Sequence, residues 1–210
     1  MARYHGAVCR LCRRQGAKLF LKGERCYTQK CAIERRRPVP GESTNSRRRR
    51  RVSEWGLHLR EKQKARHIYG VLEAQFRRHY VEATRIRGAT GENLLRILET
   101  RLDNVVYRLG WAESRKEARQ VVTHGHIAIN GRRARTPSAQ IRVGDAIGWM
   151  ERSKKSTLYE IVQHQARRRT PPTWLEMNSD ALEGKVAREP ERADMDIRID
   201  DRLIVEFYSR

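Results

Sequence analysis

Residues 100–149 read TRLDNVVYRLGWAESRKEARQVVTHGHIAINGRRARTPSAQIRVGDAIGW and contain the most regular pattern in the chain. Thr100 and Asp103 have the spacing of a capping box, which predicts that a helix starts there. Apolar residues then recur at helical intervals until Gly110, a typical helix stop. The residues of this stripe, which we expect to be buried, are Leu102, Val105, Val106 and Leu109.

A second helix is predicted by the same signals. Ser114 and Glu117 repeat the capping-box spacing, and Gly125 marks the end. Ala118, Val121 and Val122 would face inward. Because residues four apart share a helix face, Arg115 and Arg119, with Lys116 beside them, form an exposed basic face.

The next segment predicts strands. HIAINGRRA, residues 126–134, alternates apolar and polar residues around Asn130-Gly131, and this dipeptide favours a tight hairpin because both residues tolerate positive φ. IRVGDAIGW, residues 141–149, predicts another short strand pair with a Gly-Asp turn. Residues 98–150 are therefore interpreted as a helix-helix-β-hairpin module.

We predict an α+β fold that combines this module with a helical domain. The expected parts are a metal knuckle and basic arm (1–52), a helical domain (53–97), the module (98–150), and a basic helix with a C-terminal segment that packs back on the body (151–210). Within the helical domain, an apolar stripe from Leu72 to Ile86 predicts a helix capped by Gly88. RLIVEFYSR, residues 202–210, predicts a final strand.

The charge of the chain indicates a polyanionic partner. The 210 residues carry 46 Lys and Arg against 25 Asp and Glu, a formal charge of +21. No apolar run reaches the roughly 20 residues of a membrane-spanning helix, and MARYHGAVCRLC lacks an apolar signal core. We expect a cytoplasmic protein without a membrane partner.

All of the cysteines lie near the N-terminus, at Cys9, Cys12, Cys26 and Cys31. The spacing C-x2-C followed by C-x4-C predicts a structural zinc site with four thiolate ligands. An iron–sulfur cluster uses the same ligands and stays open as an alternative. Disulfides or free thiols are less favoured in a reducing compartment.

Basic residues outside the module extend the expected nucleic-acid surface. Arg47–Arg51 are five consecutive arginines in an arm rich in Pro and small polar residues, where phosphates would relieve the repulsion. The candidate RNA-binding residues are Arg13, Arg14, Arg47, Arg48, Arg49, Arg50, Arg51, Arg60, Lys62, Lys64, Arg66, Arg77, Arg115, Lys116, Arg119, His124, His126, Arg132 and Arg133.

The whole chain resembles the bacterial-type family of small-subunit ribosomal protein four. The resemblance rests on MARYHGAVCRLCRRQG, SEWGLHLREKQKARHIYGV, RLDNVVYRLG, SRKEARQ through GHIAING, TWLE and LIVEFYSR, in that order. It implies a non-enzymatic primary binder of small-subunit ribosomal RNA that nucleates assembly of the subunit body. It also implies contacts with ribosomal protein five and other small-subunit proteins, linked to translational accuracy, and Arg48, Arg49 and Arg51 at the messenger entry. We expect no homo-oligomer.

Two other functions fit parts of the sequence. Arg101-Leu102-Asp103 matches a short motif of pseudouridine synthases with Asp103 as nucleophile, but the remaining tail of about 60 residues is too short and charged for a catalytic domain. A DNA-binding regulator with a metal knuckle fits the charge and the cysteines. However, its basic residues would gather on one recognition helix, whereas here they are spread along the chain.

Overall fold

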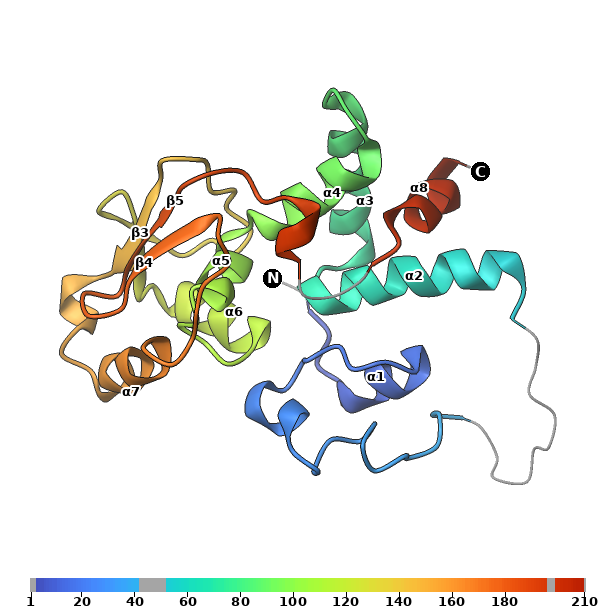
Figure 1. Ribbon diagram of the computed structural model, residues 1–210, viewed down its shortest axis with the longest axis horizontal. Coiled ribbons are helices and arrows are strands. Elements are labelled where there is room, and N and C mark those ends of the chain that lie inside the picture. The colour runs from blue at the N-terminus through green and yellow to red at the C-terminus, as the bar shows by residue number, and fades with distance from the viewer. Residues whose placement is uncertain (1–2, 42–51, 196–198, 210) are drawn as a thin grey trace. The chain divides into compact units, whose positions relative to one another are not determined.

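The computed structural model describes residues 3–41, 52–195 and 199–209. By its internal contacts the chain divides into two compact units: unit 1, Met1–Leu94 with Ile197–Arg210, and unit 2, Leu95–Asp196. Figure 1 shows helices in both and the strands in the second. The α+β class expected from the sequence is confirmed.

Unit 1 is built from helices. Its elements are α1 (Cys9–Gln15), η1 (Gly23–Tyr27), α2 (Glu54–Tyr69), α3 (Glu73–Arg85), the first half of α4 (Thr90–Glu99), and α8 (Asp201–Ser209). Helix α2 begins where Ser53 Oγ accepts a hydrogen bond from the Gly56 amide at 3.2 Å, and it ends at Gly70 with φ +63°. These caps satisfy backbone groups that have no partner within the helix.

The C-terminal segment is a helix, so the expected strand was wrong. In α8 the apolar residues Ile204, Phe207 and Tyr208 lie on one side, and Ile204 is fully buried. Figure 1 shows α8 beside α2, where Phe207 is 6.2 Å from the ring of Trp55. A short apolar run is ambiguous between strand and helix, and packing on α2 decides for the helix.

Helix α3 ends two residues earlier than expected. It stops at Arg85, with Ile86 extended, so Gly88 is not its cap. Asn93 Nδ2 donates to the carbonyl of Ile86 at 3.1 Å and holds the turn into α4. Of the predicted stripe, Phe76 is fully buried, but Ile86 is exposed.

Unit 2 contains a five-stranded antiparallel sheet with helices packed on it. Its elements are the second half of α4, α5 (Leu102–Arg108), α6 (Arg115–His124), β1 (Ile127–Ile129), β2 (Arg132–Ala134), β3 (Ala146–Trp149), η2 (Glu151–Ser153), α7 (Thr157–Ala166), β4 (Leu175–Asn178), β5 (Glu183–Val186) and η3 (Arg192–Asp194). The strand order is β2-β1-β3-β5-β4. The predicted stripes of α5 and α6 are in its core, together with the fully buried Trp111 and Trp174.

The predicted hairpin is present, and the sheet extends beyond it. Asn130 and Gly131 have φ of +48° and +76°, and Ile129 pairs with Arg132 across the turn. The segment 141–149 supplies only β3, because Asp145 Oδ2 accepts from the Arg142 amide at 2.8 Å and forms a turn where the second strand was expected. The hairpin of β4 and β5 was not predicted.

One of the two predicted capping boxes is also wrong. Ser114 Oγ accepts from the Glu117 amide at 3.3 Å, as expected for the start of α6. Thr100 instead donates to the Arg96 carbonyl at 2.9 Å, at the end of α4. Helix α5 starts after Arg101 without a side-chain cap, and this leaves Asp103 for other partners.

Candidate nucleic-acid interface

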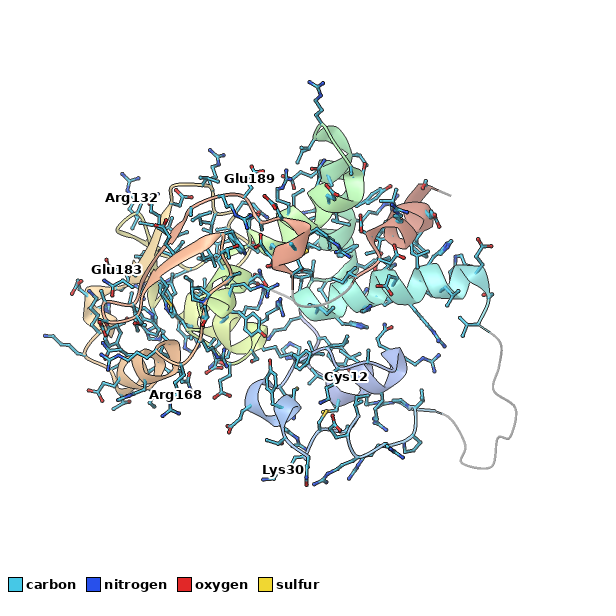
Figure 2. All side chains as sticks on the ribbon, viewed as in Figure 1. Cys12, Lys30, Arg132, Arg168, Glu183 and Glu189 are labelled. Carbon is cyan, nitrogen blue, oxygen red and sulfur yellow. The ribbon has the colours of Figure 1, made fainter. Side chains whose placement is uncertain are left out.

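The main group of predicted RNA-binding residues lies on α6 and the β1–β2 hairpin. We call it the module surface: Arg115, Lys116, Arg119, His124, His126, Arg132 and Arg133. Within it Lys116, His124, Arg132 and Arg133 are exposed, and the others are partly buried. In Figure 2 the Arg132 side chain points away from the ribbon of unit 2.

Arg119 is positioned by a buried carboxylate. Asp103 is 4% exposed and receives two hydrogen bonds from the fully buried Arg101, Nε to Oδ1 at 3.1 Å and Nη2 to Oδ2 at 2.9 Å. Arg119 Nη1 reaches Asp103 Oδ2 at 3.1 Å. Such charge-assisted bonds hold a guanidinium in a fixed orientation. They engage both oxygens of Asp103, so this carboxylate anchors the two arginines.

Arg115 is positioned by a second buried network. Glu99 is 1% exposed and accepts two hydrogen bonds from Arg108. Arg108 Nε donates to Oε2 at 3.0 Å, and Arg108 Nη2 donates to Oε1 at 2.7 Å. The amide of Asn104 donates to Glu99 Oε2 at 2.6 Å, and its oxygen accepts from Arg115 Nε at 2.7 Å. The Arg115 guanidinium also lies 4.4 Å over the ring of Tyr107, a cation–π contact.

Arg133 is fixed at the C-terminal end of α6. Its Nε donates to the Gly125 carbonyl at 3.0 Å, and its Nη2 donates to the His124 carbonyl at 3.2 Å. A cation is favoured there because the carbonyls of a helix end carry partial negative charge. Gly125 allows the approach: it has φ +77°, and an added Cβ would lie 2.4 Å from Arg133 Nε.

The two histidines of the module lie close together. The rings of His124 and His126 are 6.1 Å apart, and His126 Nδ1 is 3.0 Å from Ser153 Oγ. Burial lowers the pKa of His126, and the nearby His124 and Arg133 lower it further. His126 is therefore mainly neutral at pH 7.

The predicted residues of unit 1 have different environments. Arg14, Arg60 and Arg77 are exposed. Arg13 donates to the Pro38 carbonyl at 2.6 Å, Lys64 pairs with Glu61 at 2.9 Å, and Arg66 pairs with Glu73 at 2.9 Å. Arg47–Arg51, including the messenger-entry candidates Arg48, Arg49 and Arg51, lie outside the described residues.

Lys62 needs a correction, because it is only 4% exposed. Its Nζ pairs with Glu73 at 2.8 Å and lies 4.3 Å from the centre of the Phe207 ring. Tyr208 also donates to Glu73, at 2.9 Å. Lys62 therefore joins α2, α3 and α8 inside unit 1.

The expected metal site is contradicted. In the part of the chain that the structure describes, no group of three or more His, Cys, Asp or Glu side chains is placed to hold a metal ion. Cys9, Cys12, Cys26 and Cys31 are free, and burial together with the neighbouring thiols raises the pKa of Cys12 and Cys26. Protonated thiols pack as small apolar groups. Neither zinc nor an iron–sulfur cluster is supported, and the prediction of a metal knuckle was wrong.

Glu99 and Asn104 are positioning residues that were not predicted from the sequence. The available signal was the polar residues interleaved with the apolar stripe of α5, among them Asn104 and Arg108, which are both buried. Polar groups at such positions need partners inside the fold. The pattern does not say which partners they have.

No helix among the described residues is long and apolar enough to cross a membrane. Residues 3–99 match the family model of the ribosomal protein S4/S9 N-terminal domain, and residues 100–147 match that of the S4 domain. Full-length relatives include small ribosomal subunit protein uS4 of Heliobacterium modesticaldum and of Pelotomaculum thermopropionicum, each 56% identical over 210 residues. Small ribosomal subunit protein uS4A of Clostridium botulinum is 55% identical. In each case the alignment covers 100% of both chains.

Proposed function

The chain belongs to the uS4 family of small ribosomal subunit proteins, and on this basis we propose that it is a structural component of the small subunit that binds ribosomal RNA directly. The observation that carries the proposal is the full-length match combined with a net charge of +21. A chain with this charge binds a polyanion by releasing the counterions of its phosphates.

The module surface supports a binding role without turnover. Arg115 and Arg119 are held by Asn104 and Asp103, so their guanidinium groups lose little conformational freedom when they meet a phosphate. Asp103, the one carboxylate with a catalytic analogy, is occupied by Arg101 and Arg119. The family to which the chain belongs consists of structural ribosomal proteins, so the protein is a binder and not an enzyme.

Finer parts of the function are proposed from the family resemblance. They are nucleation of subunit-body assembly in the cytoplasm, action as a single copy beside ribosomal protein five, and contact with messenger RNA through Arg48, Arg49 and Arg51. The four-part division at residues 1–52, 53–97, 98–150 and 151–210 is proposed in the same way. Fixing several RNA helices at one protein would lower the entropic cost of later assembly steps.

Competition binding tests the proposal. The purified full chain is titrated against small-subunit ribosomal RNA, an unrelated RNA of equal length, and duplex DNA, from about 50 to 200 mM salt. We expect preference for the ribosomal transcript and a log-log salt slope of about −7 to −9, as for roughly ten phosphates. Equal affinity for the unrelated RNA, or a slope near −2, would contradict the proposal.

A further inference from the structure

Three chain segments meet at one end of the sheet in unit 2. Ile127 pairs with Ala134 of β2 and with Trp149 of β3, both antiparallel. The residue before Ile127 is therefore brought beside the residues that follow the other two strands. The backbone carbonyl of His126 accordingly accepts a hydrogen bond from the Met150 amide at 2.8 Å.

This register brings three arginines together. Arg133 lies in β2, Arg135 follows β2 directly, and Arg152 lies in η2 just after β3. Helix η2 is held near the sheet end by Ser153, whose Oγ is 3.0 Å from His126 Nδ1. We call Arg133, Arg135 and Arg152 the three-arginine site.

The site is short of negative charge. Glu151, the acidic neighbour of Arg152, pairs with Lys154 at 2.6 Å. Over the described ranges 3–41, 52–195 and 199–209, no carboxylate forms an ion pair with Arg135 or Arg152. Desolvation lowers the pKa of Arg133, and the charges of Arg135 and Arg152 lower it further. Arg135 and Arg152 therefore each place a like charge within electrostatic reach of Arg133, an arrangement that an anion would stabilise.

The chemistry of the site indicates which anion. Guanidinium groups bind phosphate through paired N–H donors, and Arg133 is already oriented by the carbonyls of His124 and Gly125. Arg135 and Arg152 are exposed. Since the chain binds RNA in the function proposed above, the available phosphate is that of an RNA backbone.

We propose that Arg133, Arg135 and Arg152 bind one phosphate group of the RNA backbone at this end of the sheet. The inference rests on the proposed function and deepens it. It adds Arg152, which lies beyond residues 100–147 that match the S4 domain. The RNA-binding surface of unit 2 thus continues past the matched module into η2.

Salt-dependent binding of full-length variants to small-subunit ribosomal RNA tests the site. Arg152→Gln and Arg135→Gln should each weaken binding by about tenfold and lower the magnitude of the salt slope by about one. Because the two residues share a phosphate, the double variant should lose the same slope of about one and not two. Arg152→Lys keeps the charge and should keep the slope.

The outcomes separate this inference from the proposed function. Arg152 is exposed, so we expect the far-ultraviolet circular dichroism and the melting temperature of Arg152→Gln to equal those of the unsubstituted chain. If that chain prefers ribosomal RNA but Arg152→Gln binds it with unchanged affinity and slope, the three-arginine site is refuted alone. Additive slope losses in the double variant would also refute it, because they indicate two separate phosphates. Lack of preference in the unsubstituted chain refutes the proposed function itself.

Discussion

Replacing Asp103 by Asn is expected to destabilise unit 2 strongly. The change keeps the shape of the side chain, removes its charge and replaces one of its two acceptor oxygens by an NH2 donor. Asp103 is the partner of Arg101, which is fully buried, and of Arg119. After the substitution the Arg101 guanidinium remains in the interior and loses the negative charge of Asp103.

The size of the effect follows from this burial. Breaking a buried ion pair by removing one partner costs about 3–5 kcal/mol, because the remaining charge stays desolvated. Asp103 accepts two bonds from Arg101, so the upper part of this range applies. Adding Arg101→Met removes the stranded charge, and the double variant should regain most of the lost stability.

Urea unfolding followed by tryptophan fluorescence measures the loss. Trp111, Trp149 and Trp174 are at most 4% exposed and belong to unit 2, whereas Trp55 in unit 1 is 53% exposed. A change in emission therefore reports mainly on unit 2. The midpoint and slope of the transition give the free energy of unfolding.

A matched control uses an exposed pair in the same unit. Asp180 pairs with Arg167 at 2.7 Å, but these side chains are 76% and 53% exposed. Asp180→Asn should cost no more than about 1 kcal/mol, as is usual for surface pairs. A loss below about 1 kcal/mol for Asp103→Asn, or a loss equal to that of the control, would refute the assignment of Asp103 as a buried anchor.

Three further predictions concern other parts of the chain. Burial, then the charge of Arg66, lowers the pKa of His67 to about 4. Between about pH 6.5 and 4 the unfolded state therefore binds a proton at His67 that the folded state does not bind, and the free energy of unfolding should fall as the pH drops through this window. The urea midpoint of the His67→Gln variant should fall less over the same pH range than that of the unsubstituted chain. Lys62→Met should leave the salt slope of RNA binding unchanged, whereas Arg132→Gln should lower its magnitude by about one. Gly131→Ala, at φ +76°, should reduce the free energy of unfolding in urea by about 1 kcal/mol.

The elements that the sequence predicted correctly are those specified by neighbouring residues. Helix α6 begins after Ser114 and ends at Gly125, and both ends are fixed by local hydrogen bonds to the backbone. The turn at Asn130-Gly131 depends only on the φ values of those two residues. Such signals depend little on the rest of the fold. They account for the helix-helix-hairpin module.

The elements that were missed depend on residues distant in the chain. Strand β5 is a strand because Gly184 and Lys185 pair with β3 and β4, and no local pattern marks this pairing. Helix α8 forms against α2, which lies more than 100 residues earlier in the chain. Just before α8, the backbone amide of Asp200 donates a hydrogen bond to Glu61 Oε1 of α2 at 2.8 Å. Short apolar segments take the conformation that their tertiary partners favour.

For the candidate site, the sequence predicted the charge but not which cations are exposed. Composition alone identified a polyanion binder, but it counted the buried Lys62 and the exposed Arg132 equally. The structure separates cations that hold the fold from cations that face solvent. In unit 2 the two roles are linked, because Arg101 and Arg119 share the single negative charge of Asp103. That carboxylate holds the partly exposed Arg119 in a fixed orientation through the same side chain that pairs with the buried Arg101.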